Sequence, residues 1–471
     1  MPGQVSAVPG FDLQPSAKRV ALQTNYITNF DFLNQYLPDT YEAEFERFGN
    51  RTVASFLRMV SAELPSNSDL IKWTEQGRLH TKYVDCTVSG DTGDGATTIT
   101  VPSGQLSAGV VNGSIAIRKG QTVLVYEEGG TGINKGIVTD VDYAARTFDV
   151  AYYEAGGQTF ADTATVSVFV YGSEFKKGTN GMEESVEADS IILENSPVII
   201  KDKYAVNGSD MAQIGWVEIA TEDGASGYLW FLKSKHETRL RYEDYLEMKM
   251  IEAVPAAGAL AGGAAALGYK GSEGLFHAIE VRGNIWSGGN PDDINDWDDI
   301  LKRLDKQGSI EENALFLDRG FALDIDNMLA AQNSYGVGGT SYGLFNNSAD
   351  MALNLGFVGF RRGSYDFYKS DWKYLNDPTV RGGIEQSRIN GVLVPAGTTT
   401  VYDNVLGKNA KRPFLHVRYR ASEAEDRRYK TWITGSAGGA SNSDLDAMEV
   451  HFLSERALCT LGANNFFLFK D

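Results

Sequence analysis

The sequence contains few cysteines and histidines, the residues on which disulfide-linked and metal-binding proteins rely. Its 471 residues include 2 cysteines, Cys86 and Cys459, 5 histidines and 12 prolines. Two distant cysteines cannot build a disulfide scaffold or a CxxC metal site, so we expect two reduced, buried thiols. No two histidines stand at a metal-ligand spacing such as HxH or HxxxH,. We therefore expect no metal site.

Long hydrophobic runs are also missing. The most apolar tract, Val254 to Leu267, is shorter than the roughly 20 residues of a membrane span and consists largely of Ala and Gly. The opening residues, MPGQVSAVPGFDLQPSAKRV, contain no apolar core of a secretory signal,. We expect a soluble protein made in a reducing cytoplasm, with no membrane partner.

Positive charge is scarce, because 43 Lys and Arg stand against 62 Asp and Glu, a formal net charge of −19. A dedicated nucleic-acid binder needs a basic footprint, so this balance argues against that class. Residues 411–430 depart from the balance, with seven basic and three acidic side chains. We expect Arg427, Arg428 and Lys430 in this segment to face acidic surface on a neighbouring copy, such as residues 292–299. The alternative is a solvated strand face.

Motifs of catalytic chemistry are absent or lack their structural context. Residues 339–343 match GxSxG, but a nucleophile elbow needs a strand before Ser341 and a helix after it, and the preceding residues predict a loop,. The stretch 89–98 is similar to a calcium loop, yet the closing position, counted from Asp91, is Pro102 instead of Glu,. No P-loop occurs, and no GxGxxG follows a strand,. We expect no enzyme and no cofactor.

Short strands dominate one part of the chain. Within residues 86–173, five strand-like runs are separated by Gly, Asn or Asp turns; they are 97–101, 122–126, 136–141, 147–152 and 165–171,. Closing such strands on one another removes exposed edges, so the pattern predicts a small β-barrel.

Helical and mixed segments follow the barrel. Residues 225–253 contain no Pro and, after Gly227, no Gly, which predicts a helix about 40 Å long,. A strand at 278–285 and a helix beginning with Asn290 as N-cap and Pro291 as first residue are expected next. A strand at 313–317 and a helix at 320–332 complete a compact α/β layer. The chain end from Met448 suits a long strand or a hairpin.

The order of these parts resembles the major capsid protein of tailed double-stranded DNA bacteriophages, whose fold is shared with herpesvirus capsid floors and encapsulins. Residues 71–85 resemble the outgoing strand of that family's extended hairpin, 190–205 its return strand, and 225–253 its spine helix. The barrel is an addition to the minimal fold. Chain size and barrel together are most similar to capsid proteins of crAss-like podoviruses.

The resemblance implies an α+β chain with the tailed-phage major capsid fold and an inserted small β-barrel. The expected domains are an N-terminal arm at 1–70, an extended loop at 71–85 and 174–222, the barrel at 86–173, a peripheral domain with the spine helix at 223–255 and 411–471, and an axial domain at 256–410. The arm cannot bury its aromatic residues alone, so Phe30 and Phe32 are expected to contact neighbouring subunits.

The implied function is structural. The chain would assemble into hexamers and pentamers of an icosahedral head, the virion capsid, after synthesis in the host bacterial cytoplasm. Expected partners are further copies, portal, scaffold, decoration or head-fibre proteins, and packaged DNA enclosed without sequence-specific binding. The alternative is a β-rich phage receptor-binding or head-decoration protein, which the barrel and the aromatic content suit. A hydrolase using Ser341 is a third possibility.

Overall fold

The computed structural model describes most of the chain after its first fifty residues and divides it into two compact units. The described residues are 53–54, 56–57, 62–77, 80–91, 96–105, 115–183, 190–212, 219–220, 226–227, 230–257, 262–308, 310–333, 358–403, 408–439 and 441–471. Unit 1 comprises Met1–Phe56, Ile199–Lys249 and Glu425–Glu455, and unit 2 comprises Leu57–Val198, Met250–Ala424 and Arg456–Asp471. Helices and several separate sheets occur together, so the predicted α+β class is confirmed.

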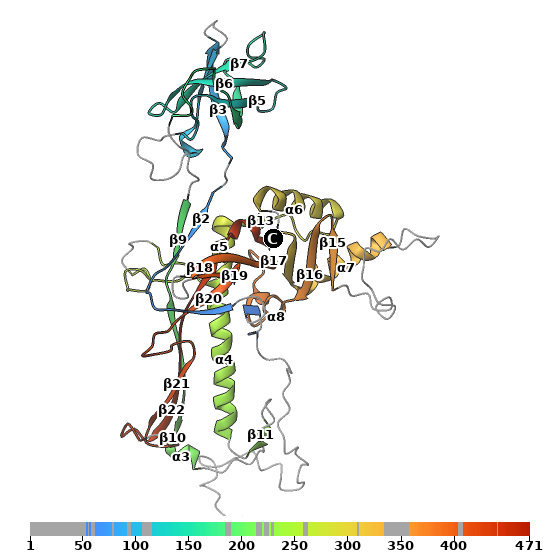
Figure 1. The fold of residues 1–471 in the computed structure, drawn as a ribbon. Helices are drawn as coiled ribbons and strands as arrows, with labels where there is room; N and C mark the ends of the chain where they lie inside the picture. Colours follow the sequence, from blue (N-terminus) through green and yellow to red (C-terminus); the bar gives the residue numbers. More distant parts are fainter. Residues whose placement is uncertain are drawn as a thin grey trace, which may run out of the picture. The chain divides into compact units, whose positions relative to one another are not determined.

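The long helix of unit 1 is α4, Trp230–Glu252, whose last three residues lie in unit 2. Its 23 residues rise about 35 Å,, and it runs as one helix (Figure 1). Three strands accompany it, namely β10 (Val198–Asn207), β21 (Lys430–Gly435) and β22 (Ala447–Thr460). Tyr242 and Leu246 of α4 pack against Val450 and Phe452 of β22. The predicted helix is confirmed, although it begins a few residues later than expected.

Short elements complete unit 1. They are α3 (Gly208–Met211), β11 (Ile219–Ala220) and β12 (Ser226–Gly227), of which the last two pair with each other. The early part of the predicted helix therefore lies in β12. None of the described helices is long and apolar enough to cross a membrane.

The barrel lies in unit 2 and is closed, with six antiparallel strands in the order β3-β4-β7-β6-β5-β8. Its strands are β3 (Lys82–Asp91), β4 (Ala96–Thr100), β5 (Gln121–Glu127), β6 (Ile133–Asp142), β7 (Thr147–Tyr152) and β8 (Thr165–Ser173). The five predicted strands are confirmed and β3 was missed. A bulge between Tyr83 and Cys86 interrupts its alternation, and Asp85 there has a φ of 50°,.

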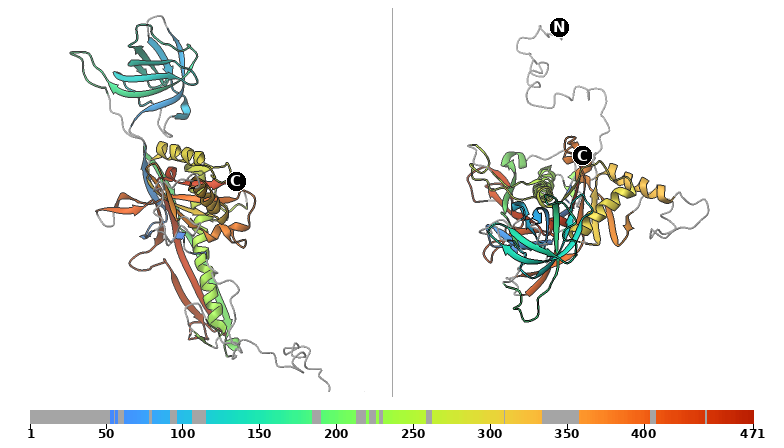
Figure 2. Two further views of the ribbon diagram at one scale, coloured as in Figure 1. Left: turned by 90° about the vertical axis from the view of Figure 1, so that its right-hand side faces the viewer. Right: turned by 90° about the horizontal axis from the view of Figure 1, so that it is seen from above.

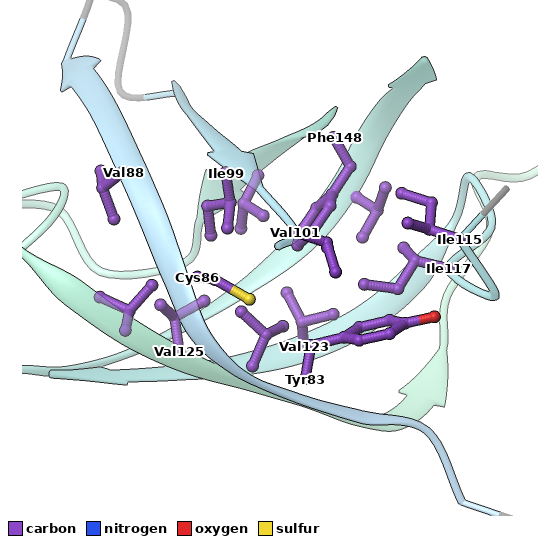
Figure 3. Close-up of a cluster of buried hydrophobic side chains, with 14 of the residues drawn as sticks. Tyr83, Cys86, Val88, Ile99, Val101, Ile115, Ile117, Val123, Val125 and Phe148 are labelled. Carbon is purple, nitrogen blue, oxygen red and sulfur yellow. The ribbon is translucent and has the colours of Figure 1, made fainter. Parts of the chain in front are cut away.

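Inward-facing side chains of all six strands fill the barrel (Figure 3). Alternation along β7 places Phe148 and Val150 inside, where they are almost fully buried,. The thiol of Cys86 lies in this apolar core (Figure 3). Cys86 and Cys459 are both free and buried, as predicted.

Two sheets among the described residues of unit 2 are ribbons of only two strands each. β2 (Ile71–Gln76) pairs antiparallel with β9 (Ser190–Asn195), the first parts of the predicted outgoing and return strands. The rest of the predicted ranges 71–85 and 190–205 does not join this hairpin, because residues 82–85 lie in β3 of the barrel and 198–205 in β10 of another sheet. β18 (Thr398–Asp403) pairs likewise with β19 (Lys408–Pro413). The barrel strands β3 to β8 follow β2 and precede β9 in the sequence. The barrel is therefore an insertion between the two strands of this ribbon.

The C-terminal part of β22 continues into unit 2. There β20 (Leu415–Arg420) pairs antiparallel with it and parallel with β1 (Ala62–Ser66). The final strand β23 (Phe467–Lys470) pairs with β13 (Asn284–Trp286) and β17 (Ile389–Pro395) of another sheet. The chain end is therefore a long strand followed by a separate one, and β22 and β23 form no hairpin.

The α/β layer of unit 2 is a six-stranded mixed sheet in the order β13-β23-β17-β14-β16-β15. Its other strands are β13 (Asn284–Trp286), β14 (Glu312–Leu317), β15 (Gly359–Arg362), β16 (Tyr365–Asp371) and β17 (Ile389–Pro395). Helices α6 (Ile294–Gln307) and α7 (Arg319–Asn333) share one core with the sheet (Figure 2). Phe316 contacts Trp372, beside α5 (Leu275–Arg282) and α8 (Lys373–Asn376). Short 3-10 turns occur at Ser103–Gln105, Arg381–Gly383 and Ala463–Asn465.

Two expectations for this layer were wrong. The strand expected at 278–285 is mostly helix α5, because Leu275, Phe276 and Ile279 bury one helical face, and strand β13 begins only at Asn284. The N-cap of α6 is Asp293, whose carboxylate accepts the amide of Ile294 at 2.6 Å.

Asn290 is not available as that cap because tertiary hydrogen bonds engage it. Its amide donates to Asp324 at 2.7 Å and accepts from Asn390 at 2.9 Å. A local capping pattern was thus overridden by contacts with residues distant in the sequence.

Candidate subunit-interface surfaces

The ribbon of β2 and β9 exposes apolar side chains on both faces. Ile191 is 56% exposed and Ile192 is 66% exposed. Successive residues of a strand point to opposite faces, so these two isoleucines lie on different sides of the ribbon. Within the described residues, neither strand pairs with a third. A bare two-stranded ribbon is marginally stable in water, and exposed apolar surface of this kind favours a binding partner.

The basic segment at 425–430 is engaged within its own chain. Arg427 Nη1 lies 3.1 Å from Glu455 Oε2, and that carboxylate side chain is only 9% exposed. Lys430 Nζ donates to Glu425 Oε1 at 2.8 Å, which lowers the pKa of Glu425. Arg428 is exposed, and its amide donates to Asp426. Of the three predicted contact residues, Arg428 is exposed, whereas Arg427 and Lys430 are half-buried. The interface role of all three stays a prediction.

The acidic helix α6 likewise has partners in its own chain. Asp298 accepts two hydrogen bonds from Arg362, at 2.8 and 2.9 Å, and these hold the pKa of Asp298 below its ordinary range. Asp299 pairs with Lys302 at 2.8 Å. The helix is therefore less negative toward a neighbour than its sequence indicates.

The arm residues Phe30 and Phe32 lie outside the described residues, as does Ser341. The described chain starts with a contact that the sequence did not reveal. Asp244 Oδ1 of α4 accepts the amides of Val53 and Ala54 at 2.9 and 3.1 Å, and Glu247 Oε1 accepts that of Phe56 at 3.0 Å.

Two carboxylates three residues apart on one helix thus accept three backbone amides in the segment 53–56. Val53 and Phe56 of this segment are buried, at 4% and 1% exposure. The one feature of the sequence that could have indicated this contact is the i, i+3 spacing of Asp244 and Glu247 in α4. The same spacing is equally compatible with a solvent-exposed face of the helix.

Polar side chains also hold the bulge of β3 in the barrel. Glu128 Oε1 accepts the amide of Asp85 at 3.0 Å and the hydroxyl of Ser167. The hydrogen bond from Ser167 lowers the pKa of Glu128, whereas the contact with Glu128 raises the pKa of Asp85. Among the described residues, no three His, Cys, Asp or Glu side chains are grouped closely enough to hold a metal ion.

Sequence comparison finds no matching protein family and no matching curated protein. Solved structures similar to the chain include one from Mycobacterium phage Ogopogo, 11% identical, which covers 95% of this chain and 100% of the other at a TM-score of 0.42. The capsid of the native GTA particle is 8% identical and covers 92% and 95% at 0.39. The holo-SrpI encapsulin complex from Synechococcus elongatus is 12% identical and covers 60% and 77% at 0.33.

A capsid and an encapsulin are among the structures to which the chain is similar. None of these three names concerns a crAss-like podovirus, and the similarity to that group stays a prediction.

Proposed function

We propose that the protein is a phage major capsid protein that assembles into the hexamers and pentamers of an icosahedral head enclosing double-stranded DNA. One observation carries the proposal: the β2–β9 ribbon exposes Ile191 and Ile192 on its two faces and has no third strand among the described residues. A ribbon that reaches a neighbouring copy buries both faces. The same contact repeated around a ring closes a capsomer.

The rest of the chain supports the same reading. A long helix, a ribbon and a mixed α/β sheet occur in the order expected of the capsid family, and the alternative receptor-binding protein accounts for neither α4 nor the sheet. The net charge of −19 suits a container for DNA, since a basic lining would hold the genome and oppose its ejection,. Portal, scaffold and decoration or head-fibre proteins are the partners that such a head would require.

Electron microscopy of the expressed full-length protein tests the proposal directly. Shells, rings or sheets of hexamers are expected. Trimeric rods would favour the receptor-binding alternative, and compact monomers at every concentration would contradict a self-assembling capsid protein.

Substitution of the ribbon isoleucines gives the first prediction. Ile191→Asp with Ile192→Asp should abolish ring and shell formation, because the charges would have to be desolvated in the contact. Both side chains are exposed in the monomer, but position 191 pairs with Glu75 in the ribbon, so the free energy of unfolding of the monomer should fall by about 1 kcal/mol,. Sizing chromatography and microscopy measure assembly, and a thermal melt measures stability.

Lys72→Gln is the matched control, since Lys72 lies on the same ribbon in an exposed pair with Glu194 at 3.2 Å. It should assemble normally. Normal shells from the double aspartate variant would show that the ribbon faces are not an interface.

A further inference from the structure

The β2–β9 ribbon is attached to the body of unit 2 through one fully used amide side chain. Asn195, the last residue of β9, is 5% exposed. Its Nδ2 donates to the carbonyl oxygens of Glu273 at 2.9 Å and Leu458 at 2.7 Å. Its Oδ1 accepts the hydroxyl of Ser272 at 3.1 Å and the amide of Glu273 at 2.8 Å. Both the nitrogen and the oxygen of this side-chain amide therefore connect the ribbon to residues that are distant in the sequence.

The other strand of the ribbon has an anchor of its own. Glu75 Oε1 on β2 accepts the backbone amide of Gly462 at 2.8 Å and the indole N–H of Trp73 at 3.2 Å. Gly462 has a φ of 60°, in the left-handed region. Glu75 pairs with Ile191 in the ribbon register.

These two anchors hold the same stretch of chain, Leu458 to Gly462. In the ribbon register Asn195 faces Ile71, four residues before Glu75, so the attachment points are separated by roughly 13 Å along the strand. Leu458 and Cys459 are buried, at 1% exposure each. Because the ribbon is held at two separated points, it cannot rotate about either of these attachment points.

A third contact acts on the same region. The guanidinium of Arg282 lies 5.8 Å from the ring centre of Trp73 and pairs with Glu273 at 2.7 Å. Glu273 is also the backbone partner of Asn195. The contacts of both strands therefore converge on the segment 272–273 and on the C-terminal stretch.

We propose that Asn195 and Glu75 are positioning residues that fix the direction in which the ribbon leaves the subunit, and thereby the angle between neighbouring copies. The proposal rests on the proposed function, because the angle matters only if the ribbon contacts a second copy. Loosening the anchors leaves the ribbon and its isoleucines intact but lets the contact form at many angles. Capsomers then form, and shells close with the wrong curvature or do not close.

Asn195→Asp tests the first anchor, since the aspartate keeps the accepting oxygen and loses both donated hydrogen bonds. Amide hydrogen exchange in β2 and β9 should accelerate roughly 10- to 30-fold, the effect of losing two modest hydrogen bonds. Microscopy should show capsomers with open or irregular shells. Glu75→Ala tests the second anchor independently, also if the buried aspartate prevents folding, and Glu75→Gln, which keeps the accepting oxygen, should restore shells of normal size.

The outcomes separate this inference from the proposed function. If the wild-type protein forms no particles, the proposed function fails. The hydrogen-exchange rates of β2 and β9 in the variants still test whether Asn195 and Glu75 anchor the ribbon. Unchanged exchange in both Asn195→Asp and Glu75→Ala, or closed shells of normal size from both, would overturn the inference. The Lys72→Gln control should match the wild type in exchange and in shells.

Discussion

Arg427 shows how much one residue's role depends on its surroundings. Its sequence context predicts a cation that faces acidic surface on a neighbouring copy. In the structure Arg427 faces the nearly buried Glu455 at 3.1 Å. Reversal at Arg427 would place two carboxylates together and destabilise the monomer itself. A single substitution at the exposed Arg428 therefore tests the interface without creating this clash.

Arg428→Glu should block shell formation and leave the melting temperature of the monomer within about 1–2 °C, because an exposed charge adds little to stability. Arg427→Glu, in contrast, should lower the melting temperature by several degrees. Calorimetry and microscopy of the two single variants distinguish these effects. Normal shells from Arg428→Glu would reduce the basic segment to a solvated strand face.

The thiol of Cys86 makes a second residue-scale prediction. Burial raises the pKa of Cys86 from 9.0 to about 12, with Glu128 and Asp85 adding to the shift. Because the folded pKa is the higher one, the contribution to stability is complete below pH 9 and is lost as the pH rises from 9 to 12.

In the Cys459→Ser variant, the remaining Cys86 should not react with a thiol reagent at pH 8 until the protein is denatured. Reaction of the native variant at the rate of a free thiol would contradict the buried position.

At the scale of elements, the barrel is a closed module whose first strand begins at Lys82. Tyr83 is 7% exposed, and its hydroxyl oxygen accepts the amide of Ala116 at 2.8 Å. The sequence placed the beginning of the barrel at residue 86. A fragment that begins there lacks the side chain of Tyr83 and the pairing of Lys82 and Tyr83 with β8. The module that the structure supports spans about residues 80–177.

Residues 80–177 expressed alone should give a soluble β-rich domain with its own cooperative melt, as a core of this size allows. Residues 86–173 should be less stable by about 3 kcal/mol or more, the usual cost of removing a large buried side chain. Circular dichroism and thermal melts compare the two. Coil-like spectra from both would show that the barrel depends on the rest of the chain.

At the scale of the whole molecule, the N-terminal region divides into two parts. Val53 and Phe56 are buried, and their amides are capped by Asp244 and Glu247. A deletion that ends before this segment removes none of these contacts. A deletion that includes it removes two buried side chains and leaves Asp244 and Glu247 without these amides.

Deletion of residues 1–38 should therefore give a soluble protein that melts cooperatively and forms no closed shells. Deletion of residues 1–57 should in addition lower the melting temperature, because lost burial and lost caps each cost about 1 kcal/mol or more. Closed particles from the shorter deletion would show that the arm is dispensable for assembly.

Local signals in the sequence determined much of this protein by themselves. The absence of Pro and of interior Gly predicted α4, and short strand-like runs between Gly, Asn or Asp turns predicted five barrel strands. Helices were also predicted where α6 and α7 lie. Few cysteines correctly implied free, buried thiols. These features depend on neighbours a few residues away, which is the range over which backbone preference and side-chain periodicity act.

The tertiary structure alone decided what depended on partners far along the chain. Asn290 is a tertiary hydrogen-bond residue instead of a helix cap, and Arg427 pairs with the nearly buried Glu455 of its own chain. Asn195 and Glu75, unremarkable in the sequence, anchor the ribbon to residues more than 260 positions away. Such roles follow from which segments the fold brings together, and a buried polar group takes the partner that lies within reach.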